Sequence, residues 1–129
     1  MMDNRQEKQD RTQYDFAFWS MLDELVRDSE IVIDRPKGSR HPKYPEMVYE
    51  VDYGYLKNTS SMDGGGIDVW RGTAQPQKVD AVICIVDRAK RDSELKILIG
   101  CTEAEKDAIY RFHNRTEGMK GIFLTRKSG

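Results

Sequence analysis

The chain has 129 residues, a mass of 15.0 kDa and a net formal charge of −1. This length supplies one hydrophobic core rather than two, so it predicts a single domain. Charged residues make up 33% of the chain without a basic surplus, which argues against a nucleic-acid-binding or membrane-surface protein. The sequence shows neither a signal peptide nor an apolar run of membrane length, so a cytoplasmic location is expected.

Residues 1–13 are mostly polar and charged with no apolar period, which predicts a flexible N-terminal segment ahead of one domain over residues 14–129. Between residues 16 and 26 the apolar side chains recur at helical spacing and predict one amphipathic helix. These side chains are Phe18, Trp19, Leu22, Leu25 and Val26. The apolar face of this helix is expected to pack on the domain or on a second subunit, so a homo-oligomer is one possible state.

Short strands dominate the rest of the chain. They are predicted at residues 30–35, near Tyr53, and at 67–71, 79–86, 94–100 and 121–125. Before the last of them, Thr102 and Glu105 form the sequence pattern of a capping box, which satisfies backbone donors at a helix start. A helix is therefore predicted over residues 103–113. By themselves these elements indicate a small mixed α+β domain.

The two cysteines, Cys84 and Cys101, lie in apolar, strand-like surroundings. A disulfide between them requires that their strands be neighbours and is uncommon in reducing compartments. They also lack partners at the spacing of a zinc site, so buried thiols are the favoured interpretation.

The stretch from Tyr49 to Val69 carries the strongest functional signal. Within it, Asp63 and Asp68 flank a run of three glycines. Carboxylates around such a turn are hard oxygen ligands for Mg²⁺, which prefers a few carboxylates together with water and a phosphate. Nearby tyrosine hydroxyls can donate hydrogen bonds to phosphate oxygens without adding charge. The stretch therefore favours a metal and a phosphoryl group over an apolar ligand.

The pattern Tyr49-Glu-Val-Asp-Tyr53-Gly54, followed by Asp63 and Asp68, resembles the soluble Mg²⁺-dependent inorganic pyrophosphatases. The resemblance extends over roughly residues 31–97 and implies a mainly β form of the α+β class. The implied fold is a small, partly open, five-stranded barrel of the oligonucleotide/oligosaccharide-binding type, with an N-terminal helix and a helix near the C-terminus. It also implies a small-molecule diphosphate as the substrate and Mg²⁺, or alternatively Mn²⁺, as the cofactor.

The resemblance assigns roles to individual residues. The implied metal ligands are Asp34, Asp63, Asp68, Asp87 and Asp92. The implied catalytic residues are Tyr53, Asp68 and Lys43, and Lys43 and Tyr49 are also expected to bind substrate. Lys96 joins the substrate-binding group because Glu94 stands where the family has a phosphate-binding lysine and Lys96 shares its strand face. Arg40, in a loop with a phosphate-loop composition, is a further candidate ligand for an anion.

Each of these residues also has a purely structural interpretation. Asp63 is then a turn former, and Asp34 makes a surface ion pair with Arg35. The run from Asp87 to Asp92 is a solvated charged hairpin, and Lys96 is an exposed strand lysine.

One departure from the family weakens the catalytic interpretation. Gly65 replaces the aspartate that bridges metals and receives the proton of the attacking water, and Gly66 replaces a proline. Loss of a general base typically costs about 10²–10⁴ in rate. Three hypotheses follow: a diverged pyrophosphatase, a hydrolase of another diphosphate compound, and a non-catalytic module that binds phosphate, metal or a protein.

Overall fold

The computed structural model describes residues 4–127, with side chains from Arg11 onward. The elements are two helices and six strands, in the order α1 (Asn4–Arg27), β1 (Ile31–Arg35), β2 (Asp52–Leu56), β3 (Ile67–Arg71), β4 (Val79–Asp87), β5 (Asp92–Ile99), α2 (Glu103–His113) and β6 (Met119–Thr125). All the predicted strands and both predicted helices are therefore confirmed, with end points shifted by at most two residues except at the start of α1.

The backbone of α1 is helical from Asn4, so the helix begins well before the amphipathic segment that predicted it. Polar residues with good helix propensity, such as Gln, Glu, Lys and Arg, can extend a helix without any apolar period. Residues 1–3, also predicted to be flexible, lie outside the described residues. The division into a flexible segment and one domain stays a prediction.

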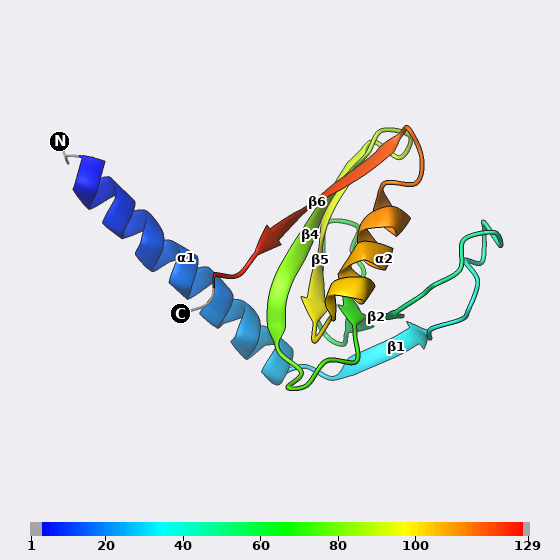
Figure 1. Cartoon of the computed structure of the whole chain (residues 1–129), viewed down its shortest axis with the longest axis horizontal. Coiled ribbons are helices and arrows are strands. Elements are labelled where there is room, and N and C mark those ends of the chain that lie inside the picture. The colour runs from blue at the N-terminus through cyan, green and yellow to red at the C-terminus, as the bar shows by residue number, and fades with distance from the viewer. Residues whose placement is uncertain (1–3, 128–129) are drawn as a thin grey trace.

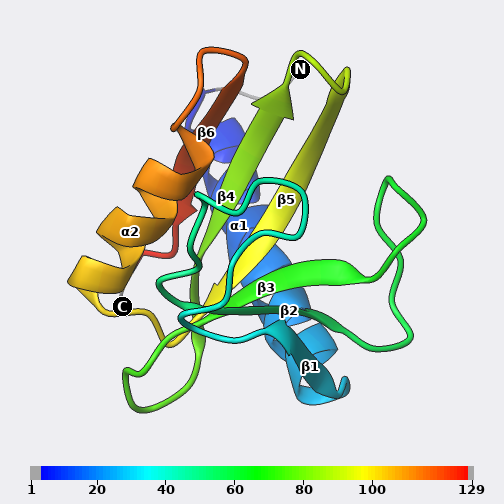
Figure 2. The same cartoon turned by 90° about the vertical axis from the view of Figure 1, so that its right-hand side faces the viewer.

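The strands form one sheet in the order β1-β2-β3-β5-β4-β6. Neighbouring strands are antiparallel except β3 and β5, which pair in parallel with Val69 opposite Ile97. Figure 2 shows β2 and β3 crossing the long β4–β5 hairpin at a steep angle, so the sheet curls into a partly open form. The mainly β class is confirmed, whereas the expected count of five strands is one too low because β6 adds to the edge at β4.

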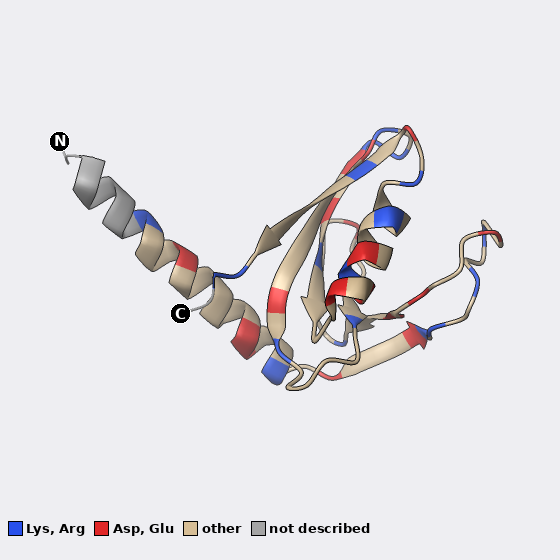
Figure 3. Cartoon of the chain, viewed as in Figure 1, with Lys and Arg blue, Asp and Glu red and all other residues tan. Residues whose placement is uncertain are grey.

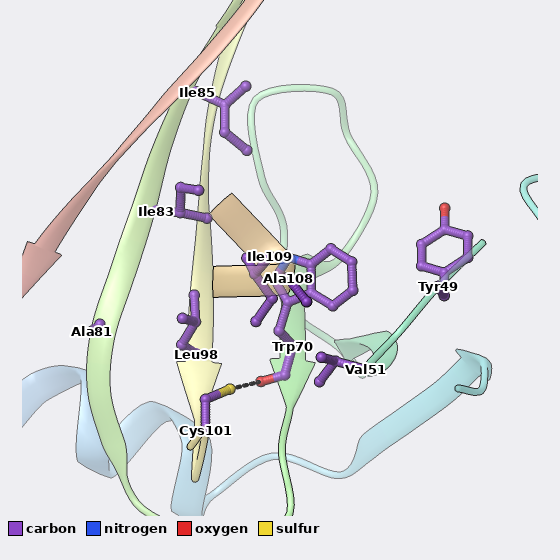
Figure 4. Close-up of a cluster of buried hydrophobic side chains, with 10 residues drawn as sticks. All are labelled: Tyr49, Val51, Trp70, Ala81, Ile83, Ile85, Leu98, Cys101, Ala108 and Ile109. Atoms are coloured by element: carbon purple, nitrogen blue, oxygen red, sulfur yellow. Dashed lines mark hydrogen bonds between the residues drawn. The ribbon is translucent and has the colours of Figure 1, made fainter. Parts of the chain in front are cut away.

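Two apolar layers hold the fold together, one on each face of the sheet (Figure 1). The C-terminal half of α1 packs on one face, where Trp19 joins Val82 and Ile97. On the other face, α2 packs with Ala108 and Ile109 against a cluster drawn in Figure 4. The parallel pair β3–β5 lies between the two layers, so its side chains reach both of them.

The predicted capping box fixes the start of α2. The Glu105 N–H donates to the Thr102 hydroxyl at 3.2 Å, and the Thr102 N–H donates to the Glu105 carboxylate at 2.8 Å. The same carboxylate accepts from Thr73, which ties the helix start to the end of β3. Within residues 4–127, neither helix is long and apolar enough to cross a membrane.

Both cysteines are free thiols, so the disulfide alternative is wrong. Cys101 is buried as predicted, and burial raises the pKa of its thiol to about 12. Cys84 is only partly buried, because it lies on the face of β4 beyond the end of the α1 cover.

Candidate functional site

A charged cluster on β2, β3 and β5 brings together three residues selected from the sequence. The Tyr53 hydroxyl donates to Asp68 Oδ2 at 2.7 Å. The Lys96 ammonium donates to the same carboxylate oxygen at 2.7 Å and to the Tyr53 hydroxyl at 2.6 Å. Strand pairing brings these three side chains together, because β3 lies between β2 and β5 in the sheet. We call Tyr53, Asp68 and Lys96 the charged triad.

Burial and charge fix the protonation of two members of the triad. Burial raises the pKa of the Tyr53 phenol, and the nearby ammonium only partly offsets this effect. For Lys96, burial alone lowers the pKa, but the contacts with Tyr53 and Asp68 outweigh it and the net pKa lies above the ordinary value. Near neutral pH the phenol therefore remains a hydrogen-bond donor and the ammonium remains a cation, so neither is suited to act as a base.

Glu94 extends the cluster toward the glycine turn. Its carboxylate lies 2.9 Å from Lys96 Nζ, so this single ammonium is shared by two acidic side chains. The Lys96 side chain is 8% exposed, which makes it a nearly buried charge held by partners. Sequence reasoning placed Glu94 and Lys96 on one strand face but did not assign Glu94 a role in the site.

Asp63 behaves mainly as a turn former. Its Oδ1 accepts from the Ser61 hydroxyl at 2.7 Å and from the Gly65 N–H at 2.9 Å. These two hydrogen bonds lower the pKa of the carboxyl group, and the Glu94 side chain adds a smaller effect in the same direction. Asp63 therefore lies near Glu94 and stays ionised, although the turn already uses one of its oxygens.

The three glycines of this turn are not equivalent. Gly64 has a φ of +83°, which favours glycine, and a Cβ on Gly66 would lie 2.8 Å from the Leu56 carbonyl oxygen. Gly65 has neither restriction, since the atom nearest to a Cβ on Gly65 would be the Asp63 carboxylate oxygen at 3.3 Å. The backbone thus requires glycine on both sides of Gly65 but accepts a side chain at Gly65 itself.

A cation missed from the sequence lies beside the triad. The Arg35 guanidinium donates a short hydrogen bond to the Tyr49 hydroxyl and lies over the rings of Tyr49 and Tyr53. The register of β1 shifts between Ile33 and Arg35, which leaves Asp34 as an extra, exposed residue. The expectation that Asp34 faces the site is therefore not met, and Arg35 points there instead. Plain strand alternation would place Arg35 on the face of Ile31, which packs on the α1 side, so the sequence held no signal for this cation.

Tyr49 itself is a core residue. Its ring is 2% exposed and contacts the rings of Tyr53, Trp70 and Phe112. Its hydroxyl is occupied by Arg35, so Tyr49 supports the site by positioning that cation. Direct binding of substrate by Tyr49 stays a prediction.

The loop between β1 and β2 carries the other predicted anion ligands. The Arg40 guanidinium donates to the Pro45 carbonyl at 2.9 Å, within the loop, and the Lys43 ammonium lies over the Tyr44 ring. Among the described contacts, none joins Arg40 or Lys43 to the triad. Lys43 nevertheless belongs to a cationic environment, because burial together with Arg35, Lys90 and Lys43 lowers the pKa of His41.

Asp87 and Asp92 face each other across the β4–β5 turn, at the last paired position of the hairpin. Asp87 accepts from the Lys90 N–H at 3.1 Å and so closes the turn, but it is nearly buried, which differs from the solvated hairpin of the structural interpretation. Both residues line a hollow of about 840 Å³ together with Asp63, Glu94 and two arginines, Arg88 and Arg91. The hairpin thus lies on the same hollow as the glycine turn, while its charges are mixed.

The predicted five-carboxylate metal centre is not preformed. Within the part of the chain whose side chains are described, no three acidic, histidine or cysteine residues converge on one point. Mg²⁺ bound with a diphosphate needs only one or two carboxylates from the protein. Asp63 and Glu94 meet that smaller requirement, since they lie near each other on one hollow. The donor set therefore fits a metal ion that arrives with its substrate.

Two buried rings, those of Trp70 and His113, lie behind the Tyr53 side of the triad. Trp70 packs edge-on against the ring of Tyr53, and its indole N–H donates to His113 Nε2 at 3.1 Å. His113 is 3% exposed, and its Nδ1 has no hydrogen-bond partner among the described residues. Because Nε2 accepts, the imidazole is neutral, and burial together with Lys96 lowers its pKa to about 3.

The lowered pKa of His113 predicts that the fold loses stability in acid. The unfolded chain takes up a proton on His113 near pH 6.5 whereas the folded chain resists until about pH 3, so stability falls as the pH drops through that window. Relative to a His113→Gln variant, which keeps an acceptor for the Trp70 N–H, the natural chain should lose about 2 kcal/mol more between pH 7 and pH 5. Urea denaturation of both proteins at the two pH values measures this difference. If both proteins lose the same stability between pH 7 and pH 5, His113 is not the buried neutral group that causes the acid sensitivity.

The curled sheet with its two helices has the fold of the inorganic pyrophosphatases. Three solved structures share it: an inorganic pyrophosphatase from Neisseria gonorrhoeae (18% identity, TM-score 0.56), an inorganic phosphatase from Anaplasma phagocytophilum (16%, 0.51) and an inorganic pyrophosphatase from Coxiella burnetii (17%, 0.52). The alignments cover 74% of this chain and 80%, 81% and 84% of those chains, respectively. At these identities the likeness establishes the fold. No protein-family model and no curated protein sequence matches the chain.

Proposed function

We propose that this protein is a metal-dependent hydrolase that cleaves inorganic diphosphate into two phosphates. The observation that carries the proposal is the nearly buried Lys96 ammonium, held between Asp68, Glu94 and the Tyr53 hydroxyl on a pyrophosphatase-type fold. Holding a buried cation among hydrogen-bonding partners suits the recognition of a compact, highly charged anion.

The cations and the phenol of this site supply contacts to phosphate oxygens. Lys96 and Arg35 keep their charges near neutral pH and approach Tyr53 from two directions. The Tyr53 hydroxyl has a raised pKa and therefore donates a hydrogen bond rather than accepting a proton from water. The role proposed for these groups is to hold the two phosphoryl groups and to stabilise the charge of the departing phosphate.

Carboxylates near the glycine turn are the proposed metal ligands. Asp63 and Glu94 would hold Mg²⁺ or Mn²⁺, and Asp68 would join them when substrate draws the Lys96 ammonium toward its own oxygens. When bound, such an ion neutralises phosphate oxygens and lowers the pKa of coordinated water. Without an aspartate at Gly65 the site has no second acidic group on the turn to receive the proton of that water, so slow turnover is expected.

A non-catalytic phosphate-binding module is the second candidate. The observation that favours it is Gly65 itself: the backbone tolerates a side chain there, so the absence of the carboxylate is not imposed by the fold. Such a module would use the same cations to bind phosphate or diphosphate and would release no product.

Phosphate release from pyrophosphate, measured with Mg²⁺ and with Mn²⁺, tests the proposal. We expect slow, metal-dependent release that falls at least about 100-fold in Asp68→Asn and rises about 10- to 100-fold in Gly65→Asp. The increase is expected because an aspartate at Gly65 places a second carboxylate beside Asp63 with little backbone strain.

The matched control is Asp107→Asn on the exposed side of α2, which removes one carboxylate far from the triad and should leave the rate unchanged. A panel of nucleoside diphosphates and triphosphates, assayed in parallel, decides whether a larger diphosphate compound is the better substrate. If every variant, Gly65→Asp included, binds pyrophosphate but releases no phosphate, the non-catalytic module replaces the hydrolase.

A further inference from the structure

The backbone of the N-terminal half of α1 lies beyond the edge of the sheet. The helix has 24 residues, roughly 36 Å, and its described contacts with the sheet involve Trp19 and residues after it. Tyr14 and Met21 are about 70% exposed and share one face of the helix with Phe18, which is 38% exposed. Figure 1 shows this half of α1 projecting beyond the sheet.

The sheet in turn has an apolar area that no helix covers. On β4 and β5, Val82 and Ile97 lie under α1, and strand alternation places Val86 and Leu95 further along the same face. On β6, Leu124 pairs with Val82 and Ile122 pairs with Cys84. The four uncovered apolar side chains on this face are Val86, Leu95, Ile122 and Leu124, between 36% and 66% exposed.

This uncovered area is hollowed. A hollow of about 500 Å³ runs over it, lined in part by Cys84, Val86, Leu95 and Ile122. Its lining includes two charged residues, Lys120 on β6 and Glu94, which also belongs to the candidate functional site. No charged residue occurs between residues 121 and 125 on β6, nor between residues 16 and 22 on α1, as Figure 3 shows for both elements.

We propose that the protein forms a two-fold dimer in which the exposed face of α1 formed by Tyr14, Phe18 and Met21 in each copy covers the uncovered sheet area of the other. The chain supplies both parts of the contact: an aromatic helix without a sheet and an apolar sheet area without a helix. Its own C-terminal half of α1 already shows that this helix and this sheet face fit together, through Trp19, Leu22 and Val26. A two-fold axis makes both contacts at once, as a self-complementary interface requires.

The area available matches that of a stable dimer. A standard interface buries roughly 800 Å² on each partner. Each subunit contributes seven exposed large apolar side chains, three from α1 and four from the sheet. Aromatic side chains bury up to about 150–250 Å² each, so Tyr14 and Phe18 supply a large part of that area.

Light scattering of the full chain at about 1 µM and about 500 µM tests the proposal directly. We expect a mass of twice 15.0 kDa at the higher concentration. Ile122→Glu and, separately, Met21→Glu should weaken the dimer at least about 30-fold, because each places a charge inside an apolar contact. Both side chains are more than half exposed in the subunit, so neither change disturbs its core. Tyr110→Glu on α2, exposed on the opposite side of the sheet, is the matched control and should leave the dimer intact.

Cys84 gives a second, independent readout. It lies partly exposed within the proposed contact, whereas Cys101 is buried with a raised pKa and should not react in the folded chain. Maleimide labelling of Cys84 should slow at least about tenfold from the dilute to the concentrated sample, and Ile122→Glu should abolish the slowing. A monomeric mass at both concentrations, or a dimer that survives both glutamate variants with no protection of Cys84, would overturn the proposal.

Discussion

Replacing Lys96 by methionine should abolish most of the proposed activity and also weaken the fold. Methionine fills a similar volume but leaves Asp68 and Glu94 close together without the ammonium that separates their charges. Uncompensated charges in a largely buried position destabilise by about 3 kcal/mol, and loss of one preorganised charge contact to the reacting phosphates lowers kcat by about 10²–10³. Urea denaturation and phosphate release from pyrophosphate, measured on the same samples, give the two quantities.

Two further variants separate the stability effect from the catalytic effect. Lys57→Met removes a lysine from an exposed ion pair with Glu30 at 3.6 Å and should change stability by less than about 0.5 kcal/mol. The double change Lys96→Met with Asp68→Asn removes one of the stranded carboxylate charges, so part of the stability should return while the activity stays low. An active Lys96→Met protein would remove the observation on which the proposed function depends.

Replacing Gly54 by alanine should prevent stable folding. A Cβ at this position would lie 1.8 Å from the Val32 carbonyl oxygen and 2.8 Å from the Ile33 Cα, and both are backbone atoms of β1. Backbone atoms cannot rotate away, so β1 must separate from β2 along their paired residues. We expect a loss of at least about 4 kcal/mol, which is a large fraction of the stability of a small domain.

Gly118→Ala is the control for this experiment, since a Cβ there meets no atom within 4 Å. Soluble yield and thermal unfolding should be close to those of the natural chain for Gly118→Ala and strongly reduced for Gly54→Ala. If Gly54→Ala unfolds within about 3 °C of the natural chain, the close approach of β1 to β2 is incorrect. Because Arg35 is carried on β1, any residual folded Gly54→Ala protein should also lose anion binding.

Local patterns in the sequence were sufficient for nearly all of the secondary structure. The helix over residues 103–113 was predicted to the residue because Thr102 and Glu105 define its start through contacts between near neighbours. The amphipathic spacing around Trp19 located the packed half of α1 but not its first turns, since polar helix formers carry no period. The six strand segments were also located, yet their pairing into one sheet of six was not, because pairing joins residues far apart in the chain.

The site was predictable only in part for the same reason. Tyr53, Asp68 and Lys96 were selected from their sequence context, and the parallel pairing of β3 with β5 is what joins them. Asp34 was expected to face the site, but Arg35 faces it, because a one-residue bulge shifts the register of β1. No residue type at that position signals the bulge. Asp87 and Asp92 lie opposite each other in the β4–β5 hairpin, where Asp87 closes the turn, and their role as metal ligands stays a prediction.

The sequence by itself determined the short-range features of this protein: the strands, the cap of α2, the glycine turn and the missing carboxylate at Gly65. These depend on contacts within a few residues, whose geometry the local residue types specify. The tertiary structure alone decided that Lys96 is a nearly buried cation shared by Asp68 and Glu94, that Arg35 rather than Asp34 faces Tyr53, and that one face of the sheet is left uncovered. Burial and charge pairing depend on which distant strands become neighbours, and that is settled only when the whole sheet assembles.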